Sequence, residues 1–301
     1  MQAPSATSAV QAESKASPRD YLELTKPRLS GLSVTTALVG YLIARPPWNF
    51  LEIFSLLLGT ALAAGGVAAL NQWIESETYA RMRRTADRPI PAGRVPTGSA
   101  FVLGALLCAG GLGVLFVKNN GVCALLALLT YVFYLAIYTP AKKWSRWSTE
   151  IGAVAGALPP LIGAAAADGG ISPLGWMLFG VLFFWQIPHF MAIAWTYRRD
   201  YAAVNFPMLP VLDESGAYVA RWSFLNAVLL AAVSLLPAIS GWCSEYYLGA
   251  ALALNAWLLW RAAAFLRPAT RDEAARKLFW CSITYLPLLL GTLLADRLIF
   301  H

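Results

Sequence analysis

The sequence contains little charge for its length. Asp, Glu, Lys and Arg make up 13% of its 301 residues, whereas 58% of the residues are hydrophobic. In soluble domains charged residues amount to about 25%. This composition excludes an ordinary soluble domain and indicates a polytopic membrane protein.

Cysteine is also scarce, and its positions follow no pattern. The sequence has four cysteines, which are Cys108, Cys123, Cys243 and Cys281. They are scattered through or beside apolar runs without the paired spacing that a disulfide framework or a zinc site requires. The sequence also lacks low-complexity tracts and repeats of solenoid length, so neither kind of fold is expected.

The N-terminal residues lack the features of a targeting signal. Residues 1–20 are rich in Ala, Ser and Gln and contain no apolar core like that of a signal peptide, and Glu13 and Asp20 argue against a transit peptide. We therefore expect residues 1–20 to form a disordered cytoplasmic tail and residues 21–301 to form a single transmembrane domain.

Long apolar runs dominate the rest of the chain. Nine of them are long enough to span about 30 Å of hydrocarbon: 29–45, 51–74, 98–117, 121–138, 150–167, 173–197, 218–240, 243–266 and 278–297. In lipid every backbone polar group must be paired, and runs of this length are too long for barrel strands. The sequence thus predicts an all-α membrane helix bundle with about nine transmembrane helices.

The basic residues predict an orientation. If the N-terminus and every second loop lie on one side, that side holds 20 of the 23 Lys and Arg residues. Because cytoplasmic loops collect Lys and Arg, we expect a cytoplasmic N-terminus in a cell (inner) membrane. This asymmetry and anionic headgroups explain the net charge of +7, so no nucleic-acid partner is expected.

The end of the second apolar run carries a candidate metal and anion site. Asn71 and Glu75 are spaced one helical turn apart, where their oxygens could hold a divalent cation. Arg84 and Arg88 follow and could bind phosphate oxygens. The alternative is that the acid only ends a helix at the headgroups and that the arginines only anchor the cytoplasmic side.

Two further segments on the predicted cytoplasmic side carry functional residues. Tyr138-Thr-Pro140 precedes Lys142 and Lys143 and leads to Pro159-Pro160, which we expect to break a helix beside a cavity. The segment Trp185-Gln-Ile-Pro-His189-Phe contains the only histidine within the runs, and Arg199 and Asp200 follow it. A histidine in a span is a functional candidate, although it could instead be a hydrogen-bonded core residue.

Together these segments resemble a known family. The Asn-x-x-x-acid pair, Met82-x-Arg-Thr-x-x-Arg-Pro89, Tyr138-Thr-Pro, Gly-Ala-x-Pro-Pro160, Trp185-Gln-x-Pro-His-Phe and Pro207-Met-Leu-Pro occur in the order and spacing of the UbiA superfamily of intramembrane prenyltransferases. Within it they are most similar to the protohaem IX farnesyltransferases, or haem O synthases. The resemblance extends from about Tyr21 to the last helix.

The resemblance implies a reaction. A farnesyl group would pass from farnesyl diphosphate to a vinyl group of haem b, with addition of water, to give haem O and diphosphate for haem A and cytochrome oxidase biosynthesis. Magnesium would be the cofactor, haem b a substrate, and the active site would face the cytoplasm. A haem A synthase or another cytochrome oxidase assembly protein would be the expected partner.

The resemblance also implies roles for individual residues. Its catalytic group is Asn71, Glu75, Arg84 and Arg88. Its metal ligands are Asn71, Glu75 and Glu77, and its substrate-binding group is Lys142, Lys143, His189, Arg199 and Asp200.

The sequence departs from the family at two positions and leaves two other functions open. Tyr79 stands where the family usually has an acid, so either Glu77 could substitute or magnesium could be held by fewer protein ligands and more water. Ser148 stands where the family often has Asn. A prenyltransferase acting on a quinone precursor would share the first motif, and a transporter of an amphipathic anion could use a similar basic bundle.

Overall fold

The protein is described by a computed structural model that covers residues 16–44, 46–82 and 85–300. Every regular element in these ranges is a helix. The first half contains α1 (Pro18–Leu24), α2 (Pro27–Ala44), α3 (Phe50–Ile74), α4 (Ser76–Ala80), α5 (Thr97–Lys118), α6 (Gly121–Tyr131), the π-helix η1 (Val132–Tyr138) and α7 (Thr139–Ala141). The second half contains α8 (Ser148–Asp168), α9 (Pro173–Thr196), α10 (Arg198–Ala202), α11 (Leu209–Leu212), α12 (Ala217–Ile239), α13 (Glu245–Phe265), the 3-10 helix η2 (Pro268–Thr270) and α14 (Arg271–Phe300).

The predicted all-α membrane bundle is confirmed, with one change in the count. Each of the nine predicted runs forms a helix, and within the described ranges eight helices are long and apolar enough to cross a membrane. The exception is α2, which has 18 residues. Its first half contains Arg28, Ser30 and Ser33, which lower its hydropathy. The expected nine spans therefore become eight candidates plus α2, which packs against α8 and α3.

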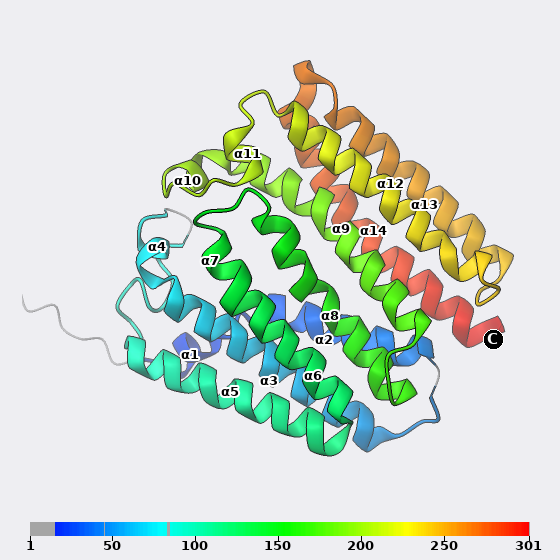
Figure 1. Ribbon diagram of the computed structural model, residues 1–301, viewed down its shortest axis with the longest axis horizontal. Helices are drawn as coiled ribbons and strands as arrows, with labels where there is room; N and C mark the ends of the chain where they lie inside the picture. The colour runs from blue at the N-terminus through cyan, green and yellow to red at the C-terminus, as the bar shows by residue number, and fades with distance from the viewer. Residues whose placement is uncertain (1–15, 45, 83–84, 301) are drawn as a thin grey trace, which may run out of the picture.

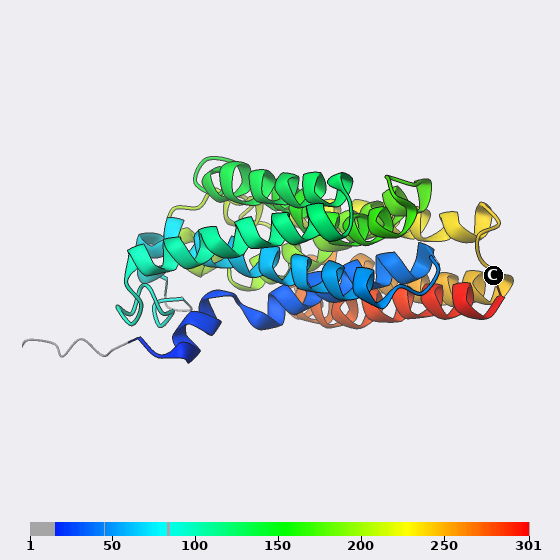
Figure 2. The same ribbon diagram turned by 90° about the horizontal axis from the view of Figure 1, so that it is seen from below.

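The long helices lie side by side, and their short connecting helices gather at one end (Figure 1). There α4, α7, α10 and α11 cluster, whereas the C-terminus of α14 lies at the opposite end (Figures 1 and 2). Among the long helices, α3 packs against α5, α8 packs against α2 and α9, and α9 packs against α12 and α14. The three polar segments singled out in the sequence thus share one end of the bundle.

The N-terminal helix corrects the predicted tail. Residues 1–15 lie outside the described ranges, but α1 begins at Pro18 because Ser17 caps it in a capping box with Asp20. Residues 18–20 are therefore helical. Arg94 then fastens α1 to the loop before α5, since its guanidinium contacts Asp20 at 2.7 Å and donates to the Asp87 carbonyl at 2.9 Å. The Ser17 hydroxyl and Arg94 lower the pKa of Asp20 to about 2.

The expected break at Pro159-Pro160 is wrong, because α8 is continuous through both prolines. The prolines still change the backbone. A proline has no N–H to donate, so the carbonyls of Ala155 and Gly156 lose their usual partners four residues further along. The π-helix η1 follows α6 directly and interrupts its regular α-helical pattern. Such π-helical segments are often found at functional sites.

Glycines bring α2 and α8 into close contact. A Cβ atom at Gly163 would overlap the carbonyl oxygen of Ala37, and one at Gly40 would overlap that of Pro160. Small residues let membrane helices approach in this way, with van der Waals packing as the stabilising interaction. This contact holds α2 against α8.

We expect Gly163→Ala to destabilise the protein by roughly 1–3 kcal/mol, because the added methyl group meets backbone that cannot rotate away. Thermal unfolding in detergent, followed by helical circular dichroism, measures the effect. Gly31→Ala is the matched control on α2, since a Cβ there has no neighbour within 4 Å. Equal unfolding temperatures for the two variants would contradict the proposed close contact.

Candidate active site

Asn71 and Glu75 meet at the end of α3, as their spacing predicts. Asn71 is 0% exposed and Glu75, the residue that ends the helix, is 1% exposed. The Asn71 amide donates to Glu75 Oε2 at 2.6 Å and lies 3.1 Å from Thr139 Oγ1 on α7. A carboxylate is thus held inside the protein at the end of the bundle where the polar segments gather.

Tyr79 completes this cluster, and Glu77 does not. The Tyr79 hydroxyl lies 2.6 Å from Glu75 Oε2 and 2.9 Å from Asn71 Oδ1. Glu77 is exposed and makes no hydrogen bond or ion pair with any residue that the structure describes. Tyr79 follows Glu75 by four positions, about one helical turn, whereas a step of two positions turns Glu77 to the other side. The structure thus places Tyr79, where the family has an acid, beside the predicted ligands and leaves Glu77 apart from them.

Three cations surround the carboxylate. Lys142 Nζ forms an ion pair with Glu75 Oε2 at 2.7 Å, and Lys26 Nζ donates to Asn71 Oδ1 at 3.2 Å. The Arg88 guanidinium lies 4.2 Å from the centre of the Tyr79 ring. Lys26 was not predicted. It lies between α1 and α2 with a left-handed backbone (φ 47°), and only this turn directs its side chain to Asn71.

The charges in the cluster are unbalanced. Burial acts to raise the pKa of Glu75, but the Lys142 charge and the hydrogen bonds from Lys142, Tyr79 and Asn71 outweigh it, so the pKa is lowered. Burial and the Glu75 charge hold the pKa of Tyr79 well above 10. Burial, together with the Arg88 and Lys142 charges, lowers the pKa of Lys26 to about 7. One ionised carboxylate among three basic groups leaves an excess of positive charge, which an anion would relieve.

Two buried atoms of this cluster have no partner among the described residues. They are Glu75 Oε1, an acceptor, and Arg88 Nη1, a donor. An unpaired buried polar atom costs about 1–3 kcal/mol, so each is expected to meet a ligand. A cation fits the first atom and a phosphate oxygen fits the second. The described ranges contain no group of three His, Cys, Asp or Glu residues that could hold a metal. An ion here would therefore keep several waters, as Mg²⁺ does.

An apolar cavity of about 140 Å³ opens beside the cluster. Lys26 and Tyr134 lie in its wall, and the deeper lining is small or apolar, with Ala63, Val67 and Ile162 among its members. The wall comes from α2, α3, α5, α6, η1 and α8. η1 supplies Tyr134 and also Tyr138, whose ring centre lies 4.6 Å from Lys142 Nζ. The site therefore combines an anion-attracting mouth with a hydrophobic interior.

Four other predicted residues lie away from this cluster or outside the described ranges. Arg84 falls outside them. Lys143 and Arg199 are exposed, and Asp200 is half-buried on α10. The side chains of Lys143, Arg199 and Asp200 make no hydrogen bond or ion pair within the part of the chain that the structure describes.

His189 lies between α9 and α14 instead of in the cavity wall. Its Nδ1 atom is 2.8 Å from Ser282 Oγ, and its ring stacks on Trp185 with centroids 4.7 Å apart. Phe279 lies on its other side at 5.2 Å. The residues that line the 140 Å³ cavity do not include His189. The structure thus gives its imidazole a partner on α14 and separates it from the Asn71 cluster.

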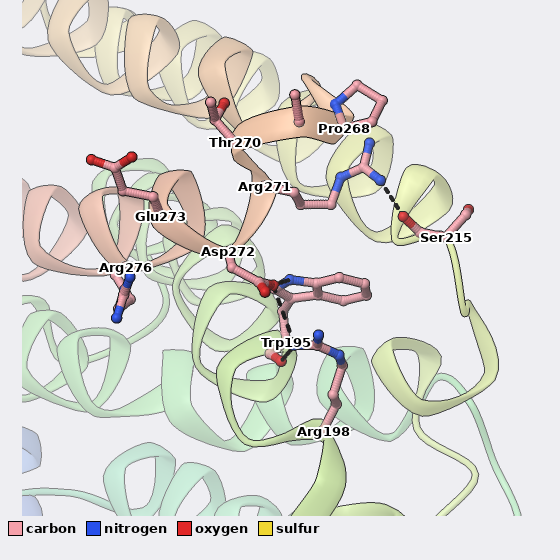
Figure 3. A pocket seen from close by; sticks show the side chains of 10 residues that line it. Trp195, Arg198, Ser215, Pro268, Thr270, Arg271, Asp272, Glu273 and Arg276 are labelled. Carbon is pink, nitrogen blue, oxygen red and sulfur yellow. Dashed lines mark hydrogen bonds and ion pairs between the residues drawn. The ribbon is translucent and has the colours of Figure 1, made fainter.

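A larger cavity, of about 410 Å³, lies between the end of α9 and the start of α14 (Figure 3). Three of its charged groups already have partners within the protein, which are Arg198, Arg271 and Asp272. Asp272 accepts from the Trp195 indole at 2.7 Å and lies 3.4 Å from Arg198 (Figure 3). Arg271 donates to the carbonyls of Ser215 and Leu266, which fixes the loop before α12. No member of the Asn71 cluster lines this cavity, so we place the candidate active site at the smaller one.

Comparison with known sequences identifies the family. The sequence model of the UbiA prenyltransferase family matches residues 33–283, a range that includes Asn71, Glu75, Tyr79 and most of the cavity wall. The chain belongs to the UbiA prenyltransferase family. A protoheme IX farnesyltransferase from Opitutus terrae is 64% identical over 279 residues, which cover 93% of this chain and 95% of the relative. The predicted family is thereby confirmed.

Two solved structures share the fold. A digeranylgeranylglyceryl phosphate synthase superposes with a TM-score of 0.80 at 18% identity, over 93% of this chain and 98% of the other. A UbiA homologue from Archaeoglobus fulgidus, solved with GPP and Mg²⁺, superposes with a TM-score of 0.61 at 12% identity, over 91% and 99%.

We expect Tyr79→Phe to lower the stability of this UbiA prenyltransferase by about 1–2 kcal/mol. The change removes the hydroxyl that lies against Asn71 and Glu75 and leaves their buried oxygens with fewer donors. Unfolding in detergent measures the loss. Tyr134→Phe is the control, because the Tyr134 hydroxyl makes no hydrogen bond with the described residues. If the two variants unfold alike, the Tyr79 hydroxyl does not hold the cluster together.

Proposed function

We propose that the protein transfers a farnesyl group from farnesyl diphosphate to a vinyl group of haem b, with addition of water, to give haem O and diphosphate. One observation carries the prenyl-transfer part: a buried carboxylate surrounded by three cations at the mouth of an apolar cavity. The haem acceptor is supported by the relative from Opitutus terrae, a protoheme IX farnesyltransferase 64% identical to this chain.

Lys26, Arg88 and Lys142 bind the diphosphate in this proposal. Lys26 contacts Asn71, Lys142 contacts Glu75, and Arg88 lies over the Tyr79 ring. Arg88 Nη1 has no partner within the described ranges. Charge-assisted hydrogen bonds to phosphate are the strongest that these groups make. Arg84 is proposed to join them, since it precedes Arg88 by one helical turn's length of chain. Exposed Lys143, Arg199 and half-buried Asp200 are left out of this group.

Asn71 and Glu75 are the residues that would hold Mg²⁺. The unpartnered Glu75 Oε1 fits a hard cation, and the UbiA homologue from Archaeoglobus fulgidus was solved with GPP and Mg²⁺. When bound, the ion supplies charge that makes diphosphate a better leaving group. Asn71, Tyr79 and Lys142 fix the Glu75 carboxylate in place beforehand, so no reorganisation is needed during the reaction.

The reaction then follows from the shape of the cavity. The farnesyl C1–O bond breaks and its electron pair leaves with the diphosphate, which the three cations stabilise. The allylic cation is left in the apolar cavity, where the faces of Tyr131 and Tyr134 stabilise it. The π electrons of the haem vinyl group form the new C–C bond, and a water oxygen bonds to the remaining cation as one proton is lost.

His189 acts as a positioning residue in this proposal. Its hydrogen bond to Ser282 holds α9 against α14, and Gln186, about one turn earlier on α9, packs against α8. A contact between His189 and haem itself would require haem to enter between α9 and α14.

The membrane orientation is part of the same proposal. The end of the bundle that carries the cluster also carries the loops rich in Lys and Arg (Figure 1). By the positive-inside rule that end faces the cytoplasm. Both anionic substrates would then reach the site from the cytoplasmic leaflet.

We expect membranes containing the protein to convert haem b when they are supplied with farnesyl diphosphate and Mg²⁺. Mass analysis of the extracted haem should find the added farnesyl and hydroxyl groups. Release of diphosphate only with an added quinone precursor would identify the alternative prenyltransferase. Uptake of farnesyl diphosphate without any bond cleavage would identify a transporter. Either result would overturn the proposed function.

We expect Lys142→Met and Lys26→Met each to raise the KM for farnesyl diphosphate by roughly ten- to hundredfold, because each variant loses one charge-assisted bond to phosphate. The KM for haem should change much less. Steady-state kinetics in detergent measure both constants. Lys143→Met is the matched control, since Lys143 is exposed and adjacent in sequence. An equal rise in both constants would show that these lysines bind the haem propionates instead.

A further inference from the structure

Gln186 places an unused hydrogen-bond acceptor inside the bundle. This α9 residue is only 6% exposed and lies within a membrane-spanning helix. Its Nε2 atom donates both of its hydrogens, to the carbonyl of Ala153 at 3.0 Å and to that of Leu182 at 3.1 Å. These bonds fix the amide plane. The opposite atom, Oε1, receives no hydrogen bond from any residue that the structure describes.

This oxygen lies beside Gly156, a glycine of the active-site cavity wall. A Cβ atom at position 156 would overlap Gln186 Oε1, so the amide oxygen fills the space beside the glycine. Gly156 itself lines the cavity. Any larger residue at position 156 would therefore force Oε1 away from its place beside the wall.

Two backbone carbonyls lie in the same part of the wall. Pro159 and Pro160 cannot donate to the carbonyls of Ala155 and Gly156, which line the cavity. Gln186 Oε1 and these two carbonyls thus form what we call the acceptor patch. All three atoms accept hydrogen bonds, and none donates.

The acceptor patch lies close to the expected position of the reacting carbon. Gly152 packs against the Tyr138 ring, so one turn further along α8 Gly156 is level with Tyr134, one turn earlier in η1. The Tyr134 ring centre lies 5.2 Å from that of Tyr138, whose ring centre in turn lies 4.6 Å from Lys142 Nζ. The patch is therefore about one helical turn, roughly 5 Å, deeper than the diphosphate-binding cluster.

We propose that Gln186 and the carbonyls of Ala155 and Gly156 position the water that is added in the reaction, an inference that rests on the proposed function. The farnesyl chain and the vinyl edge of haem carry no hydrogen-bond donor, so water is the reactant that acceptors alone can bind. Water held through its hydrogens turns a lone pair toward the cation. Its oxygen bonds to the former vinyl carbon, and the proton that is released passes to the departing diphosphate.

If this water is not held in place, the cation reacts in a second way. Without a nucleophile, the cation loses a proton from the neighbouring carbon and forms a C=C bond. The product is then a farnesylated haem that is lighter by one water. The ratio of hydroxylated to dehydrated product therefore reports on water positioning separately from the rate of farnesyl transfer.

The test compares the haem products of the full-length protein with those of two variants, all in isotopically labelled water. Gln186→Met keeps the side-chain volume but removes the acceptor, and Gly156→Ala keeps Gln186 but displaces its flexible end. Each variant should lower the ratio of hydroxylated to dehydrated product by about tenfold, the effect of losing one hydrogen bond of ordinary strength. The matched control is Asn226→Leu, which removes an amide buried on α12 outside the cavity.

The outcomes separate this inference from the function on which it rests. If the unmodified protein makes hydroxylated product and both variants keep its product ratio, whatever their rates, the water-positioning role is overturned alone. If the unmodified protein farnesylates no haem, the proposed function fails first. If Gln186→Met fails to fold, Gly156→Ala still tests the proposal. Its added methyl group meets only the end of the Gln186 side chain, which can move aside.

Discussion

The ion pair between Glu75 and Lys142 is the interaction on which the arrangement of the site depends. A carboxylate that is 1% exposed is stable only if it is paired and hydrogen-bonded, because removal of one partner of a buried pair costs about 3–5 kcal/mol. Its partners come from separate elements: Lys142 follows α7, Tyr79 lies in α4, and Asn71 lies in α3. The need to satisfy one carboxylate therefore draws the ends of several helices together.

The same cluster explains why an anionic substrate would bind there. Lys26, Arg88 and Lys142 exceed the single carboxylate in charge, and Arg88 Nη1 lacks a partner within the described ranges. The protein keeps this imbalance at the mouth of an apolar cavity, where the interactions are weakly screened. A prenyl diphosphate has the complementary distribution, with its charge at one end and hydrocarbon at the other.

Much of the fold, but only part of the site, could be predicted from the sequence. Apolar runs report spans because lipid imposes length and hydropathy directly, and the Asn71–Glu75 pair follows from helical spacing. Lys26 could not be predicted, since a left-handed turn between two helices brings it to Asn71. The charge of Glu77 favours it as a metal ligand, but its spacing of two residues turns it away from Glu75. Tyr79 lies one helical turn beyond Glu75, so its spacing alone predicts that it belongs to the cluster.

The prolines and the π-helix show how polar chemistry is introduced into a hydrophobic bundle without extra charged residues. Pro159 and Pro160 leave α8 continuous but release two carbonyls. The π-helix η1 carries Tyr134, which lines the cavity, and Tyr138, whose ring lies against Lys142. A charged side chain at the same depth would need a partner of its own. A backbone carbonyl carries no net charge, so a hydrogen bond from one water satisfies it without creating a second ion-pair site.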